Sequence, residues 1–222
     1  MRLFRASVLA ALTCAALARP LSAQTGTLPF QDAWYWGVYG GQISFATSVA
    51  RTIAPTIGAD WMITRPNFAL HVFAEQSYFT DAVSTITDFP TGAPRNVTMS
   101  DMRRVGVNAM IFTPQPTANL RPYVGLGYAF NFIREAAPVG NYYASAAAKD
   151  SITARINRGR TAGKLFGQFG MLYTYKRWAP FVEYTVMPTQ GAQTWMVNGD
   201  GFTSAWTLGV RFNMGTSVDK KW

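Results

Sequence analysis

Charged residues are scarce in this chain. Only 14% of the residues are charged, against about 25% in an average soluble domain. Hydrophobic residues make up 49% and aromatic residues 14%. Beyond the N-terminal segment, no apolar run approaches the roughly 18 residues that a membrane-spanning helix needs. These absences exclude a helical membrane protein and favour one that crosses the bilayer with β-strands, because a closed barrel satisfies every backbone hydrogen bond internally.

Cysteine is almost absent as well, since Cys14 is the single one. It lies in the apolar run Ala6–Ala18, which follows a basic start and precedes small residues up to Ala23. This pattern predicts a secretory signal peptide over residues 1–23, cleaved near Ala23, and one barrel domain over residues 24–222. The mature protein is therefore expected to be exported without disulfides.

Acidic residues are fewer than basic ones, and the formal net charge is +9. Arg2, Arg5 and Arg19 belong to the signal peptide, so the mature chain keeps 17 basic and 11 acidic residues, or +6. Nucleic acid is an unsuitable partner for an exported protein. We expect anionic outer-membrane lipids or lipopolysaccharide instead.

Motifs that carry chemistry are lacking too. The chain has one histidine, His71, and shows no phosphate-binding glycine loop, zinc-ligand spacing or serine-hydrolase elbow. We therefore predict no catalytic residues, no metal site and no cofactor.

The most informative feature that is present is the segment RPYVGLGYAFNF, residues 121–132. Large apolar side chains alternate with small or polar ones, which indicates a β-strand with two different faces. The small face, with Gly125, Gly127 and Asn131, has too little volume to build a soluble core. A membrane barrel reverses the soluble rule, because bulky groups face lipid and small or polar groups face the lumen.

The same period of two predicts eight strands and a fold class: all-β, an eight-stranded antiparallel up-and-down transmembrane β-barrel. Gly40-Gly41 is expected to interrupt the first strand, since the apolar parity changes beyond it. The predicted strands are 33–45, 56–64, 68–79, 99–112, 121–132, 164–175, 180–187 and 202–214.

The predicted connections alternate in length. Short ones are Arg65-Pro66, residues 113–120 and residues 176–179, and long ones are residues 46–55, 80–98, 133–163 and 188–201. Bacterial outer-membrane barrels have short periplasmic turns and long extracellular loops, so this alternation predicts the orientation of the barrel.

Several ionisable residues fall on the lumen parity. With a two-residue Arg65-Pro66 turn, Asp60 lies opposite His71, either as a carboxylate orienting a base or as a hydrogen bond that fills the lumen. Ion pairs are expected in a lumen this narrow, because buried charges must be paired. They form a structural plug or a gate that opens by exchanging partners. The expected pairs are Glu183–Arg211 and Glu75–Arg104.

The third long connection, residues 133–163, is basic. Part of Ser145 to Asn157 is expected to form a short helix ending at Gly159. The loop is either a solvated charged surface or a site that binds lipid phosphates or other anions. Its basic residues are Arg134, Lys149, Arg155, Arg158 and Arg160.

These features together resemble the eight-stranded outer membrane protein A/X-type barrels, including the related W-type channel family. The resemblance is carried by the Trp34-Tyr35 strand opening and by the segments RPYVGLGY, PFVEY and LGVRF, and it covers essentially the whole mature chain. It implies an interior Glu–Arg cluster that includes Glu183 and Arg211. It also implies insertion by the barrel-assembly machinery through a C-terminal aromatic residue, either Phe212 or Trp222.

The functional expectation is a monomeric, non-enzymatic protein of the bacterial outer membrane with a structural or surface-binding role. Adhesion, lipid contact and host contact through the long loops all fit this role. A narrow channel for small or apolar solutes is the alternative. A lipid A-modifying enzyme is less favoured, because no serine is expected beside His71.

Overall fold

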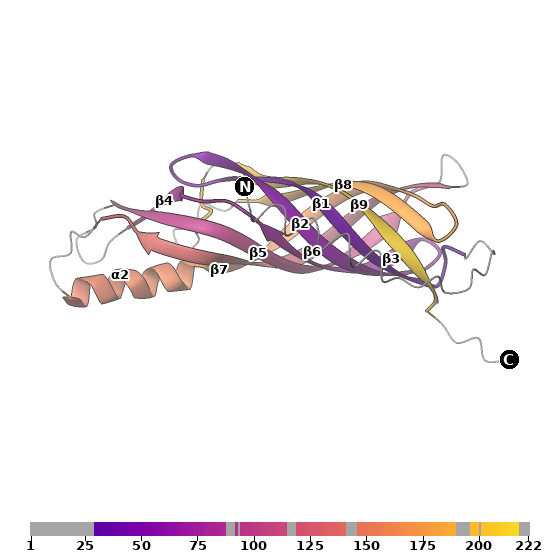
Figure 1. The fold of residues 1–222 in the computed structure, drawn as a ribbon, viewed down its shortest axis with the longest axis horizontal. Coiled ribbons are helices and arrows are strands. Elements are labelled where there is room, and N and C mark those ends of the chain that lie inside the picture. Colours follow the sequence, from indigo (N-terminus) through magenta and orange to yellow (C-terminus); the bar gives the residue numbers. More distant parts are fainter. Residues whose placement is uncertain are drawn as a thin grey trace, which may run out of the picture.

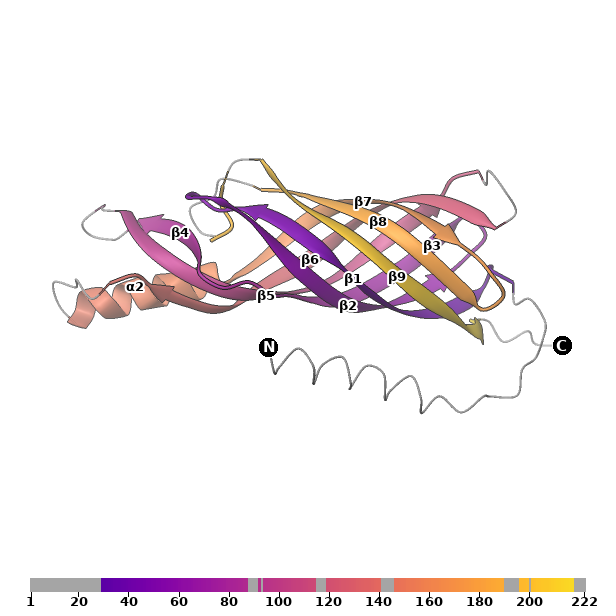
Figure 2. The same ribbon diagram turned by 45° about the horizontal axis from the view of Figure 1, so that its top comes forward.

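The computed structural model describes residues 29–87, 92, 94–114, 119–140, 146–189, 196–199 and 201–217. The predicted signal peptide and Trp222 lie outside the described residues. The chain forms an elongated barrel of tilted strands, with one helix beside the end that is drawn at the left (Figures 1 and 2). Its elements are β1 (Ala33–Ala46), β2 (Arg51–Thr64), β3 (Phe68–Ser77), β4 (Ala82–Thr87), β5 (Pro94–Phe112), β6 (Leu120–Pro138), α2 (Ala146–Gly159), β7 (Thr161–Tyr173), β8 (Trp178–Pro188) and β9 (Phe202–Thr216).

The sheet is closed and antiparallel throughout. β1 pairs with both β2 and β9, and β3 pairs with β5. The short strand β4 continues the position of β3, because both lie against β5, β3 on residues 102–111 and β4 on residues 94–99. The predicted eight-stranded up-and-down barrel is confirmed.

The first short turn differs from the prediction by one residue. Arg65 N donates to Phe68 O over 2.7 Å, so the turn is Pro66-Asn67 rather than Arg65-Pro66. The register then places His71 opposite Met62 and Asp60 opposite Phe73. The expectation that Asp60 and His71 are direct cross-strand partners is therefore wrong, although both point into the lumen.

The first outer connection is also shorter than predicted. β1 and β2 remain paired to Ala46 and Arg51, and the turn is closed by Thr47 N donating to Ala50 O over 2.9 Å. The proposed long loop over residues 46–55 is thus wrong, and long and short connections do not alternate strictly. β4 and the extensions of β5 and β6 likewise occupy parts of the other predicted loops.

The middle of the barrel has the inverted arrangement expected in a bilayer. Large apolar side chains cover its outside, and Val38, Leu126 and Leu208 are each more than 60% exposed. The lumen side carries glycines and polar groups such as Asn108 and Gln168, both buried. An apolar outer surface around a polar lumen is the arrangement typical of barrels that span a membrane.

The outer end is built differently. Ile43 and Phe45 point inward and are fully buried, and the β1–β2 register runs without a break past Gly40 and Gly41, so the predicted interruption is wrong. The change of parity occurs instead on β5, where Met102 and Met99 are both buried on either side of Asp101 (φ 54°). Beyond that point β5 has the arrangement of a soluble protein, because Val97 and Met99 face an apolar core and the polar side chains of Asn96, Thr98 and Ser100 face outward.

The predicted short helix is confirmed as α2, which packs on this outer core. Ile152 and Ile156 are 2% exposed and belong to the same buried cluster as Phe45 and Val97. In Figures 1 and 2, α2 lies beside the projecting end of the barrel, where its neighbouring strands are β6 and β7. No helix within the described ranges is long and apolar enough to cross a membrane.

Candidate functional sites in the lumen and at the outer rim

Arg211 on β9 is the centre of the lumen network. Its side chain is fully buried, and Nε donates to Asp60 Oδ2 over 2.8 Å. A terminal nitrogen lies 2.7 Å from the same oxygen and 3.5 Å from Glu183 Oε2. The guanidinium also stacks on Phe181, with 3.7 Å from Cζ to the ring centroid. One cation thus holds two carboxylates, one from β2 and one from β8, the strands that flank β1 and β9.

His71 extends this network across the barrel. Its Nε2 lies 3.0 Å from Asp60 Oδ2, and its Nδ1 lies 2.7 Å from Asn108 Oδ1. Asn108 in turn donates to Gln168 Oε1. Both ring nitrogens are therefore engaged. Ser77, the serine on the same face, bonds Thr56 instead, so within the described chain no nucleophile is hydrogen-bonded to His71.

Arg104 and Glu75 are direct partners in the β3–β5 register and approach to 2.8 Å. Glu75 is also reached by Tyr39, whose hydroxyl donates to Oε2 over 3.1 Å. Gly58 on β2 is the cross-strand partner of Tyr39 on one side and of Glu75 on the other. The tyrosine ring therefore lies over Gly58 on its way to the glutamate. A Cβ at Gly58 would lie 2.4 Å from the ring, so only glycine leaves room for this contact.

The same arrangement recurs across the barrel. Tyr123, Gly170 and Glu183 are register neighbours on β6, β7 and β8. The Tyr123 hydroxyl donates to Glu183 Oε2 over 2.8 Å, and a Cβ at Gly170 would lie 2.3 Å from its ring. Each interior glutamate is thus fixed by one arginine and one tyrosine.

The charges of the lumen nearly balance. The two guanidinium groups of Arg104 and Arg211 face three carboxylates. The network holds these residues in fixed positions and fills the cross-section. The ionised residues are Asp60, Glu75, Arg104, Glu183 and Arg211.

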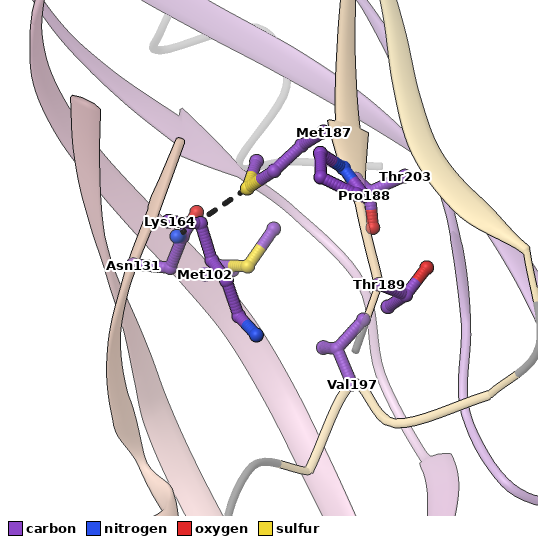
Figure 3. Close-up of a pocket in the computed structure, with 8 residues that line it drawn as sticks. All are labelled: Met102, Asn131, Lys164, Met187, Pro188, Thr189, Val197 and Thr203. Atoms are coloured by element: carbon purple, nitrogen blue, oxygen red, sulfur yellow. Dashed lines mark hydrogen bonds between the residues drawn. The ribbon is translucent and has the colours of Figure 1, made fainter. Parts of the chain in front are cut away.

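A small cavity lies above this network, towards the outer end (Figure 3). Its volume is about 10 Å³, which is room for about one water molecule. It is too small to hold a solute. Its lining residues are Met102, Asn131, Lys164, Met187, Pro188, Thr189, Val197 and Thr203.

A larger hollow lies on the outside of the barrel, where β5, β6 and the end of α2 meet. Its volume is about 470 Å³, and a second hollow of about 300 Å³ adjoins it, since both are lined by Arg134 and Arg160. We call the two together the rim groove. The larger hollow is lined by Arg103, Phe132, Ile133, Arg134, Asn157, Arg160 and Thr161.

The five basic residues predicted in the third connection do not form one site in the structure. Arg134 and Arg160 come together in the rim groove, whereas Lys149, Arg155 and Arg158 lie on α2 and do not line it. Arg103 completes the groove from β5. Spacing along the sequence did not indicate Arg103, because it belongs to a strand outside the basic loop.

Sequence reasoning also missed the polar partners Tyr39, Asn108, Tyr123 and Gln168. All four alternate with the outward-facing residues of their predicted strands. This alternation indicates that their side chains face the lumen, and it is the signal that could have identified them. Which of them touch the ion pairs depends on the stagger between strands, which the sequence does not display.

No protein-family profile and no curated protein matches the sequence. Among solved structures, Neisserial surface protein A is similar with a TM-score of 0.52 and 13% identity, over 82% of this chain and 97% of that one. The N-terminal barrel domain of Pseudomonas aeruginosa OprF gives 0.47 and 12%, over 83% and 98%. Ail of Yersinia pestis gives 0.46 and 8%, over 83% and 100%.

At such identities the likeness concerns the fold. The chain has the fold of the eight-stranded outer-membrane barrels represented by Neisserial surface protein A, which confirms the fold resemblance read from the sequence.

Proposed function

We propose that the protein is a non-conducting, non-enzymatic barrel of the bacterial outer membrane that acts by binding at its extracellular end. The predicted signal peptide, the lipid-facing belt and the fold support the location. The long projecting strands and α2 support the assignment of binding to the outer end, because they form a folded platform rather than loose loops.

The observation that carries the proposal is the filled lumen. Paired charges occupy the middle, and an apolar cluster that includes Tyr35, Met62 and Leu172 fills the periplasmic end. A second apolar cluster, which includes Phe45 and Val97, fills the outer end. A barrel of eight strands is just wide enough for side chains to fill it, so no continuous water path is expected.

The absence of enzymatic activity is supported by the contacts of His71. An enzyme of the serine type would need a hydroxyl within hydrogen-bond reach of this base, and here Asp60 and Asn108 occupy both ring nitrogens. The residue is better explained as part of the lumen network.

The test is reconstitution of the purified mature protein into planar bilayers, combined with fractionation of cell envelopes. We expect recovery in the outer-membrane fraction, a heat-modifiable band on gels, and no steady single-channel current. Regular conductance steps would contradict the sealed lumen and favour the narrow-channel alternative. Recovery without detergent in the soluble fraction would contradict the membrane location.

A further inference from the structure

We infer that the rim groove binds a phosphate group of an anionic glycolipid in the outer leaflet, with the acyl chains of that lipid lying along β5 and β6. This inference rests on the proposed outer-membrane location. It goes further in naming the partner, the site and the residues that make the contact.

The charge of the groove is the first argument. Three arginines and no carboxylate line the larger hollow. Arginine is the side chain best suited to phosphate, because its planar fork of N–H donors matches two phosphate oxygens at once. Glu135 lines only the smaller hollow, which leaves the larger one as the place for an anion.

The three guanidinium groups are positioned by the protein but not saturated by it. Arg103 Nε donates to Gln76 Oε1 over 2.9 Å, and Arg160 Nε donates to the Ile133 carbonyl over 3.0 Å. Arg134 lies 3.5 Å from Asp101 Oδ2 and stays half exposed. Since each guanidinium has five N–H donors, most donors of these groups have no protein acceptor in the described chain.

The position of the groove selects a lipid over a dissolved anion. Phe132 forms part of its lining, and the outward side chains of Phe130 and Tyr128 continue below it on β6, all between 39% and 51% exposed. Arg103 is the cross-strand partner of Phe132. The cations therefore stand directly above an aromatic surface that faces acyl chains, at the height where phosphates of the outer leaflet lie.

The size of the groove fits this ligand. By the measure on which about 10–15 Å³ admits one water molecule, the larger hollow offers about 470 Å³, which is room for a hydrated phosphate and part of the sugar that carries it. Asn157 and Thr161, which also line the hollow, offer uncharged donors and acceptors to such a sugar.

The experiment measures binding of lipid A to the full mature protein in nonionic detergent micelles by native mass spectrometry. The probes are lipid A with two phosphates and lipid A with both phosphates removed. The test variant is Arg134→Gln/Arg160→Gln. The control variant is Lys149→Gln/Arg158→Gln, which removes the same charge from exposed positions of α2.

We expect the wild type to prefer the phosphorylated lipid. The groove variant should raise the dissociation constant about tenfold or more, because two charge-assisted contacts are lost, while the α2 variant should change it less than about twofold. Equal binding of both lipids, an unchanged constant in the groove variant, or an equal loss in the α2 variant would overturn the inference. If millimolar inorganic phosphate displaced lipid A, the groove would be a site for a dissolved anion, and the inference that it binds a membrane lipid would be wrong.

Heat-modifiability of every sample separates the possible failures. A wild type that is not a folded barrel contradicts the proposed function itself. A folded barrel whose lipid binding ignores the groove contradicts only this inference. If the double variant fails to fold, Arg134→Gln alone provides the test, because this side chain is 54% exposed and its removal leaves no buried group unpaired.

Discussion

Two glycines determine how the interior glutamates are held. At Gly58 and Gly170 a tyrosine ring from the neighbouring strand lies against the backbone, and its hydroxyl passes over to a glutamate on the third strand. Neither glycine has a positive φ. They are required for space rather than for backbone conformation, which makes them sensitive to the smallest added side chain.

Gly170→Ala should therefore lower the stability of the barrel. The new methyl group would force the ring of Tyr123 aside and lengthen its bond to Glu183, and overpacking of this kind costs about 1–3 kcal/mol. Gly167→Ala is the matched control on the same strand, because its Cβ would meet Val186 at an ordinary 3.6 Å. The midpoint of urea unfolding in detergent measures both. Equal midpoints would show that Tyr123 moves without cost.

Arg211→Met should be among the most damaging changes in the lumen. It leaves Asp60 and Glu183 buried without their shared cation, at a cost of about 3–5 kcal/mol. Adding Asp60→Asn should recover part of that loss, because the buried charge is removed with its partner. The temperature of the heat-modifiable gel transition measures the series.

The control for this series is Arg65→Met, which breaks an ion pair with Asp32 at the periplasmic rim. Both side chains are more than a third exposed, so the change should cost about 1 kcal/mol or less. If Arg211→Met were no worse than Arg65→Met, the lumen pairs would contribute little to folding.

At the residue scale, alternation predicts which side chains enter the lumen but not which ones meet. Asp60, His71, Glu75, Arg104, Glu183 and Arg211 were all placed on the inner face by parity. Glu75 and Arg104 do lie directly opposite each other on neighbouring strands. Arg211, by contrast, lies opposite Ala179 and reaches Glu183 diagonally, because tilted strands bring together residues that are several positions apart.

Among the elements, α2 is the one whose docking can be tested alone. Ile152→Ala/Ile156→Ala removes its two buried anchors, and each large-to-small change in a core costs about 2–5 kcal/mol. We expect the helix to detach while the barrel stays folded, so trypsin added to intact vesicles should cleave at Arg155 or Arg158. The measurement is the appearance of the two fragments on gels.

Thr153→Ala controls for loss of helix propensity. Thr153 is exposed, and its hydroxyl bonds only the Lys149 carbonyl within the helix, so the variant should resist trypsin as the wild type does. Rapid cleavage of the wild type would contradict the packing of α2 on the outer core.

The strand ends were the least predictable part of the fold, and the reason is physical. The period of two continues on β1 from Trp36 to Phe45, but the environment changes along it. In the bilayer the large side chains face outward, and above it Ile43 and Phe45 face inward to build a core. A sequence shows the alternation without showing where lipid gives way to water, and for this reason the sequence predicts β1 to within one residue of its end but assigns residues 51–55 of β2 to a loop.

At the scale of the whole molecule, the position of the outer membrane surface along the barrel axis determines which residues contact lipid and which contact water. The change from an apolar to a polar outer face occurs near Asp101 on β5 and Arg134 on β6, which also places the rim groove at the membrane edge. The single cysteine of the chain, Cys14, lies in the predicted signal peptide. The mature protein therefore offers a background free of thiols for locating this boundary.

Cysteines introduced on the outward face of β5 should report the boundary directly. Thr98→Cys lies above Asp101, and Val107→Cys lies below it on a side chain that is 45% exposed. The two are about 30 Å apart along the strand. In intact proteoliposomes, a membrane-impermeant maleimide should label Thr98→Cys rapidly and spare Val107→Cys until detergent is added. Because Val107 is open to the outside of the barrel, only lipid can protect it, and fast labelling of both positions would place the barrel outside a membrane.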